Sequence, residues 1–479
     1  MIAVCLTLSM APTVAGANSL IPTDGPRSSG TAPGPGLTSD ATAREGFDVA
    51  LRGVAEQAPP PPPPPPADNS GEFTALPPTR ILDTRPDFGS SQTLGRRDTL
   101  RIPIAGRGGV PAQGVSAVVM NATAVGATAP TFVSIWPTGA PLPNVSNLNP
   151  SVGGIAANMV TIALGDDGSV QAFNLDGSTD LLLDVVGYYS TADGPNGARF
   201  VSLQPSRAID TRENVPGRPR APMGPRSVET FDFNPLFEGG VVGAGVTALV
   251  ANVTITEPTA PSFLTVTPHG NEIPNASHVN FFPGQTIPNL VTVQVPPTGL
   301  VDFFNLDGSA HLIVDVVGVY TAHDDLGGFG RFVPLPPVRA GDTRDGFGVV
   351  GPDELIVVNV ATDATGVPAE AQAIAANVTV TETTSPGFVT VFTDDSCVVP
   401  NASNLNFGPG ETTANAAIVG VSAGLECANG PGRIDLYNAL GDVHLIVDVS
   451  GYFTGVTPAS SSISLDGLVA RDRLAVADR

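Results

Sequence analysis

The amino-acid sequence predicts an all-β protein in which three antiparallel β-sandwich modules, jelly-roll or Ig-like, follow one another along the chain. Glycine (54 residues) and proline (48 residues) are abundant among the 479 residues, which favours turns over long helices. Leu249–Thr256 alternates apolar and polar side chains, the pattern of a half-buried strand. A turn followed by an apolar strand with a central aspartate recurs three times, at Asn174–Tyr189, Asn305–Tyr320 and Asn438–Phe453. Each copy closes a unit of roughly 120 to 130 residues, the size of one domain, and a closed barrel is the alternative fold.

The first part of the chain has the composition of a leader and a stalk. Residues 1–17 are apolar, lack acidic side chains and end in Ala-Gly-Ala, which is typical of a signal-peptide cleavage site, although the basic start of such a peptide is missing. Residues 18–71 are rich in Pro, Gly and Ser, and positions 59–66 are eight consecutive prolines. That run favours a stiff polyproline II spacer, or a peptide that docks into an aromatic groove. No stretch is long enough to span a membrane as a helix.

Three modules are predicted at 72–191, 199–322 and 331–455, followed by a tail at 456–479. Each module opens with the motif Pro-x-Arg-x-x-Asp-Thr-Arg and continues with a variable segment rich in Gly and Pro. A strand centred on Asn-Ala-Thr or Asn-Val-Thr comes next, then a shorter strand, the motif Pro-Asn-x-Ser-x-x-Asn, a valine-rich strand and the closing strand. The central strand asparagines are Asn121, Asn252 and Asn377.

An aspartate within each closing strand shares a face with apolar neighbours, so we expect it to be buried. A buried carboxylate requires a partner, and the arginines of the opening motif of the same module are the candidates. A pair of catalytic carboxylates is the alternative, but three copies in three similar modules favour a structural role. The residues concerned are Arg80, Asp83, Arg85 and Asp184; Arg207, Asp210, Arg212 and Asp315; and Arg339, Asp342, Arg344 and Asp448.

These motifs resemble a repeat module of exported actinobacterial surface proteins, which carries Arg-x-x-Asp-Thr-Arg, Asn-Val-Thr, Ser-Asn-Leu-Asn and a terminal Asp-Val-x-Gly-Tyr-Tyr. The resemblance extends over about 380 residues, roughly three domains. It implies secretion or a cell-envelope address, a β-rich fold and an accessory or binding role. Module two departs from the pattern, because it reads Ser277-His278-Val279-Asn280 where the family has Ser-Asn-Leu-Asn.

Charge and cysteine content narrow the class of protein. The formal net charge of −23 argues against nucleic-acid binding, which selects basic faces. Cys397 and Cys427 both lie in the third module, which suggests a local disulfide and an oxidising compartment, with two free thiols as the alternative.

Other motifs have weaker functional interpretations. Asp176, Asp307 and Asp442 lie in turns and could supply oxygen ligands to Ca²⁺, but Asx-turns explain them equally and no cofactor is predicted. The segment 420–424 reads Gly-x-Ser-x-Gly, yet its β-rich surroundings do not suit a nucleophile elbow. Six Asn-x-Ser/Thr sequons are interpreted as structural motifs of turns and strand ends rather than glycosylation sites. They begin at Asn121, Asn144, Asn252, Asn275, Asn377 and Asn401.

The sequence therefore predicts a secreted or cell-surface, non-enzymatic protein that binds or scaffolds at the cell envelope. Its expected partner is an envelope polymer or a surface protein, and its oligomeric state stays open. One alternative is a surface hydrolase, or an accessory to one, with a site built from loops. The other is a structural coat or appendage subunit that assembles through strand edges.

Overall fold

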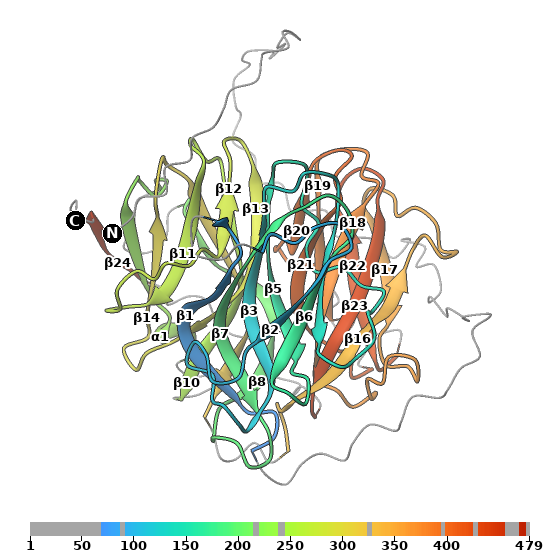
Figure 1. The fold of residues 1–479 in the computed structure, drawn as a ribbon. Coiled ribbons are helices and arrows are strands. Elements are labelled where there is room, and N and C mark those ends of the chain that lie inside the picture. Colours follow the sequence, from blue (N-terminus) through green and yellow to red (C-terminus); the bar gives the residue numbers. More distant parts are fainter. Residues whose placement is uncertain are drawn as a thin grey trace. The chain divides into compact units, whose positions relative to one another are not determined.

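The computed structural model describes residues 69–86, 92–213, 220–237, 245–322, 328–393, 398–424 and 430–455, together with the backbone of 469–475. Strands dominate these residues, and the short helix α1 (Asn234–Phe237) is the one α-helix among them (Figure 1). The all-β prediction is thus confirmed. The predicted leader, the polyproline run, Cys397 and Cys427 lie outside the described residues.

Each module contributes two antiparallel sheets, which gives six sheets among the described residues (Figure 1). The strands of module one are β1 (Phe73–Asp83), β2 (Thr99–Pro103), β3 (Val115–Val125), β4 (Val133–Pro137), β5 (Ile155–Ala163), β6 (Ser169–Asn174) and β7 (Asp180–Ser190). Those of module two are β8 (Arg199–Asp210), β9 (Ser227–Asp232), β10 (Val246–Thr256), β11 (Ser262–Pro268), β12 (Val279–Phe281), β13 (Thr286–Gln294), β14 (Leu300–Asn305) and β15 (His311–Thr321). Those of module three are β16 (Phe332–Asp342), β17 (Glu354–Asn359), β18 (Ala373–Thr381), β19 (Gly387–Thr393), β20 (Leu405–Phe407), β21 (Thr413–Gly420), β22 (Arg433–Asn438) and β23 (His444–Phe453).

The strand order decides between the two predicted sandwich types. In module two one sheet has the order β13-β10-β15-β8, and the other begins β12-β11-β14-β9. The first strand of the module therefore pairs with the eighth, the second with the seventh, the third with the sixth and the fourth with the fifth. This winding of a long antiparallel hairpin into two sheets is the jelly roll. Module three repeats the order, and module one does so with its fifth strand reduced to a bridge between Val133 and Leu148.

Each module encloses its own apolar core between its two sheets, as the alternating strands predict. A fourth apolar cluster contains residues of all three modules, because the sheet that holds the first and last strands of each module also packs against the other modules. The prediction that Leu249–Thr256 is half-buried is therefore wrong. Every residue of this segment is buried, since its polar face lies against another module.

Two further features complete the described chain. Strand β24 (Val469–Ala475) follows module three in sequence but pairs with β9 of module two. Among the described residues no helix is long and apolar enough to cross a membrane.

Candidate functional site at the inter-module interface

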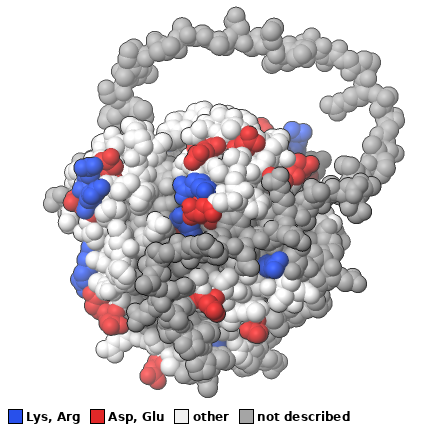
Figure 2. Space-filling view, turned by 90° about the vertical axis from the view of Figure 1, so that its right-hand side faces the viewer, with Lys and Arg blue, Asp and Glu red and all other residues white. Residues whose placement is uncertain are grey.

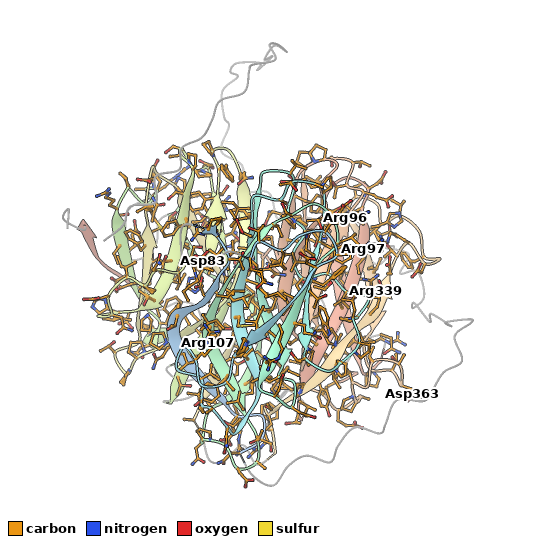
Figure 3. The ribbon with its side chains drawn as sticks, viewed as in Figure 1. Asp83, Arg96, Arg97, Arg107, Arg339 and Asp363 are labelled. Carbon is orange, nitrogen blue, oxygen red and sulfur yellow. The ribbon has the colours of Figure 1, made fainter. Side chains whose placement is uncertain are left out.

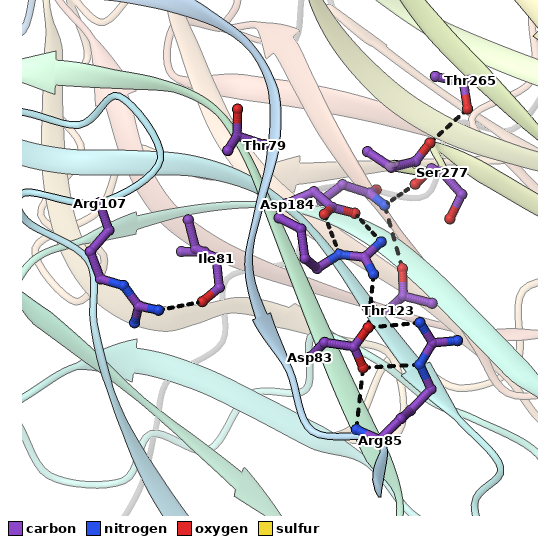
Figure 4. A network of polar contacts seen from close by, with 12 residues as sticks. Thr79, Ile81, Asp83, Arg85, Arg107, Thr123, Asp184, Thr265 and Ser277 are labelled. Carbon is purple, nitrogen blue, oxygen red and sulfur yellow. Dashed lines mark hydrogen bonds and ion pairs between the residues drawn. The ribbon is translucent and has the colours of Figure 1, made fainter. Parts of the chain in front are cut away.

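The opening motif and the closing strand of each module meet in one polar cluster, drawn for module one in Figure 4. Arg80 lies opposite Asp184 in the ladder between β1 and β7. Its Nε and Nη2 donate to the two carboxylate oxygens of Asp184 at 2.5 and 3.0 Å, and its Nη1 donates to Asp83 at 3.0 Å. Arg85 completes the row, because its Nε and Nη2 donate to the other side of Asp83 at 2.9 and 2.7 Å. The end of the module is thereby fastened to its beginning.

The same row of alternating charges recurs in modules two and three. Arg207 lies 2.8 Å from Asp315 and 3.4 Å from Asp210, which also pairs with Arg212 at 2.6 Å. The third copy places Arg339 at 2.8 Å from both Asp448 and Asp342, and Arg344 at 2.6 Å from Asp342. Asp83 and Arg339 are labelled in Figure 3 and belong to the first and third copies. The structure thus brings all twelve predicted residues into three equivalent clusters.

Burial and the arginines act on these carboxylates in opposite directions. Burial raises the pKa of Asp184, Asp315 and Asp448 within the strands, and the neighbouring arginine partly offsets that rise. For Asp83, burial would also raise the pKa, but the hydrogen bonds and charges of Arg85 and Arg80 outweigh it and hold the pKa below its usual value. Asp210 and Asp342 have lowered pKa values for the same reasons. Because arginine donors occupy these carboxylate oxygens, the cluster is suited to holding the first and last strands of a module together.

The strand asparagines form a cyclic set of hydrogen bonds between modules. Asn121 of module one donates through Nδ2 to the carbonyl of Ser277 in module two, a contact visible in Figure 4. Asn252 of module two donates in the same way to Ser403 of module three. The ring closes with Asn377, which donates to Ser146 of module one at 2.8 Å. Each acceptor is the serine of the Pro-Asn-x-Ser motif in the next module.

A second asparagine from each module closes the same ring. Asn289 donates to Asn121 at 2.8 Å, Asn415 donates to Asn252 at 2.9 Å, and Asn158 donates to Asn377 at 2.7 Å. Their Oδ1 atoms accept backbone N–H groups from another module, namely those of Met159, Leu290 and Ala416. We call these six residues the asparagine ring: Asn121, Asn158, Asn252, Asn289, Asn377 and Asn415. All six are buried, and each makes hydrogen bonds to another module.

An aromatic cluster lies at the other end of the interface. Each module contributes the ring that begins its first strand and the ring that ends its closing strand. Phe73 stacks on Tyr320 of module two, Phe200 lies against Phe453 of module three, and Phe332 stacks on Tyr189 of module one. The hydroxyls of Tyr189 and Tyr320 hydrogen-bond to each other.

This aromatic cluster explains the glycine of the closing motif. A Cβ atom on Gly318 would overlap the ring of Phe200, and the equivalent glycines receive the equivalent rings in the other two modules. In each closing strand the aspartate binds the opening arginine, the glycine accommodates the opening phenylalanine, and the final aromatic residue packs against a neighbouring module.

A backbone ring and an ion triad adjoin the aromatic cluster. The N–H of Phe73 donates to Ala198, that of Phe200 to Gly330, and that of Phe332 to Gly71, at 2.7 to 2.9 Å. The residues just before these phenylalanines are Glu72, Arg199 and Arg331. Glu72 accepts from Arg199 at 3.1 Å and from Arg331 at 3.2 Å, and Arg331 also donates to the carbonyl of Ser70. Residues 70 and 71, assigned to the stalk by sequence, thus take part in the interface.

The sequence pattern predicted a structural role for the six sequons, three of them within strands, but did not reveal that these three join modules. Asn121, Asn252 and Asn377 belong to the asparagine ring, whereas Asn144, Asn275 and Asn401 are exposed on loops. The sequence feature that indicates burial between modules lies in the closing strand. Apart from its aspartate, Leu312–Tyr320 is apolar or glycine on both faces, which is typical of a strand covered on both sides.

The remaining candidate sites have ordinary structural surroundings. Asp176 forms an exposed ion pair with Arg96, and Asp307 and Asp442 are exposed. No group of three or more His, Cys, Asp or Glu side chains capable of holding a metal occurs within the described ranges. Ser422 of the Gly-x-Ser-x-Gly segment is buried, donates to the carbonyl of Gly430 at 2.9 Å and is not followed by a helix in the described chain.

Comparisons with known proteins leave the chain without a family. No family model matches it, and neither does any curated protein. Among solved structures, it shows similarity to the triple jelly roll fold and turret assembly of an archaeal virus. That match covers 81% of this chain and 91% of the viral chain at 7% identity, with a TM-score of 0.15. Because so low a TM-score carries no argument, the jelly-roll assignment rests on the strand order described above.

Proposed function

We propose that this chain is an exported, non-enzymatic scaffold of the cell envelope, in which three jelly-roll modules act as one body. The observation that carries the proposal is the cyclic inter-module interface. The polar residues that recur in every module are engaged in joining strands or joining modules. Residues that recur for catalysis would instead converge on a cleft with free donors and acceptors.

The exported, envelope-bound part of the proposal is supported by the sequence of the first 68 residues and by the resemblance to exported actinobacterial modules. The surface is compatible with this role. On the face drawn in Figure 2, charged side chains form small groups of both signs separated by uncharged surface, with no basic stripe of the kind that nucleic acid requires. The partner we propose is an envelope polymer or a protein exposed on the cell surface.

The test is retention on isolated cell envelopes. Purified chain would be incubated with actinobacterial cell walls, with purified peptidoglycan and with washed membranes, and the bound fraction measured after sedimentation together with any soluble sugar or peptide released. We expect retention on a wall fraction without release of soluble products. Absence of retention on every fraction would overturn the envelope role, and time-dependent release of products would support the hydrolase alternative. A sample of the denatured chain serves as the control for nonspecific adhesion.

A further inference from the structure

The contact surface between two modules is called a seam below, and the three seams differ in how the chain connects them. Residues 191–198 join module one to module two, and residues 322–331 join module two to module three. No peptide connection crosses the third seam, because the chain runs from module one through module two to module three. Both connections begin and end beside the aromatic cluster. Modules one and three are therefore held together by non-covalent contacts alone.

Module three also contributes smaller side chains to the packing between modules. Three positions show the difference: the residue two before the first ring asparagine, the residue directly after the second, and the residue two after the closing-strand aspartate. Modules one and two have valine, methionine or leucine at these positions, whereas module three has alanine or serine. The residues compared are Val119, Val250 and Ala375; Met159, Leu290 and Ala416; and Val186, Val317 and Ser450. All except Ser450 belong to the apolar cluster shared by the modules.

A cavity of about 20 Å³ lies where these side chains are small. Its wall contains Ala375, Ala416 and Ser450 of module three together with Val145 and Met159 of module one. The volume is close to that of one water molecule. Apolar groups missing from a packed interface forfeit their contacts with the facing side chains. The seam between modules three and one is therefore less tightly packed than its two equivalents.

Solvent also reaches the asparagine ring at this seam. Asn377 is 8% exposed, whereas its equivalents Asn121 and Asn252 are 1% exposed. At the rim of the same seam, Nη2 of Arg339 donates to the carbonyl of Asn144 at 3.1 Å in an exposed position. Water competes for hydrogen bonds that it can reach, so these contacts stabilise the seam less than buried ones do.

We propose that the three-module body opens at the seam between modules three and one, while the other two seams stay closed. Opening separates Asn377 from Ser146, and it separates the N–H of Ala416 from Asn158. The aromatic end, where both chain connections lie, serves as the pivot. The scaffold thereby has a gate between its first and last modules. This inference concerns the folded body and does not depend on retention on an envelope.

One backbone amide at each seam reports on its opening. The N–H groups of Met159, Leu290 and Ala416 donate to ring asparagines of another module at 3.2, 3.1 and 2.7 Å. They lie at the seams between modules one and two, two and three, and three and one. Ala416 makes the shortest of the three bonds, so bond length alone predicts that its amide is the best protected from exchange.

Hydrogen exchange of the full chain, resolved to single residues by mass spectrometry, gives a protection factor for each of these amides. We expect protection at Ala416 to be about tenfold or more below that at Met159 and Leu290, because the opening exposes Ala416 without unfolding the modules. Equal or greater protection at Ala416 would overturn the proposal.

Low concentrations of urea distinguish a local opening from global unfolding. Exchange through a local opening depends weakly on urea, because little surface becomes exposed. We expect the exchange of Ala416 to have a shallower urea dependence than that of Met159 or Leu290. A slope for Ala416 equal to the slope of global unfolding would contradict a separate opening of this seam.

A variant that fills the cavity tests the cause of the opening. Ala375→Val combined with Ser450→Val restores the side chains that modules one and two have at these positions. We expect the protection of Ala416 to rise to the level of Met159 and Leu290, which should not change. Unaltered protection of Ala416 in a folded variant would count against the packing argument and the proposal built on it.

The matched control makes the opposite change in module one. Val119→Ala combined with Val186→Ser introduces the small side chains of module three at the equivalent positions. We expect the protection of Met159 to fall and that of Ala416 to stay the same. Equal changes at both amides would show that exchange reports overall stability rather than one seam, which would also overturn the proposal.

Discussion

Glu72 of the first module and Arg331 of the third form an ion pair of 3.2 Å, although 258 positions separate them in the sequence. Both side chains are buried to more than nine-tenths, and Glu72 also accepts from Arg199 of the second module. At these three equivalent positions the one acidic side chain attracts both basic side chains, whereas three side chains of the same charge would repel one another. The ion triad thus marks the seam at which the last module meets the first.

Replacing Glu72 with Gln should destabilise the protein strongly, because the buried Arg331 and the partly buried Arg199 each lose a negatively charged partner. We expect a loss of about 3–5 kcal/mol in the free energy of unfolding, measured by urea denaturation. The matched control is Asp167→Asn, which removes the partner of Arg101 in an exposed pair and should leave the urea midpoint nearly unchanged. Similar costs for both variants would contradict the role of the triad.

The asparagine ring offers a control within one module. Asn252→Ala removes the donor to Ser403 and the acceptor for Asn415, and leaves these buried groups short of a partner. We expect a loss of about 2–3 kcal/mol by urea denaturation. Asn275→Ala changes the same residue type at an exposed sequon of module two and should stay within about 0.5 kcal/mol of the parent. If the asparagine ring does not contribute to stability, the urea denaturation curves of Asn252→Ala and Asn275→Ala will coincide.

His278 should make the stability of module two sensitive to mild acid. Its Nδ1 accepts the N–H of Val266 at 3.1 Å, while Asn147 and Asn404 accept the equivalent N–H groups in the other modules. Burial lowers the pKa of His278 to about 4, below the usual value of about 6.5. The unfolded chain therefore binds the proton more readily, so stability is complete above about pH 6.5 and falls as the pH drops toward 4.

The variant His278→Asn removes this dependence. Between pH 7 and pH 5 we expect the parent to lose about 2 kcal/mol more than the variant, from the 1.36 kcal/mol that each pH unit contributes. Urea midpoints at the two pH values provide the measurement, and the carboxylates that titrate in both proteins cancel in the difference. Parallel losses would show that protonation of His278 is not coupled to unfolding.

The tyrosine pair predicts a non-additive double mutant. Tyr320→Phe leaves the buried hydroxyl of Tyr189 without its partner, so we expect a loss of about 1–3 kcal/mol. Changing both residues to Phe should recover most of that loss, because no buried hydroxyl then remains. Phe453 already occupies the equivalent position of module three. Thermal unfolding of the two single variants and the double variant tests this, and additive losses would refute it.

Asp315→Asn tests the lock between the two ends of a module. The variant keeps the size of the side chain but removes the charge that faces Arg207, and we expect it to cost about 2–3 kcal/mol. Asp307→Asn, in the exposed turn before the same strand, is the control and should be nearly neutral. An unchanged melting temperature for Asp315→Asn would refute the lock.

The sequence predicted the strands of each module taken separately. Alternation in Leu249–Thr256 identified a strand, and the apolar stretch around Asp315 identified the closing strand. Local periodicity reports which side chains share a face, but it does not report what covers that face. Asn252 therefore looked like a solvent-facing residue of a half-buried strand, whereas it lies at 1% exposure between two modules. Residues such as Glu72 and Arg331 are brought together solely by tertiary packing, so no local pattern could pair them.

The cyclic direction of the asparagine ring has a consequence for how such chains can lengthen. Module one donates to two, two donates to three, and three donates back to one. A chain with two modules would leave one donor face and one acceptor face exposed. A fourth module would have no unoccupied donor or acceptor face to pair with. Gene duplication within this architecture is therefore expected to preserve copy numbers divisible by three, and shorter relatives are expected to restore the count through association of separate chains.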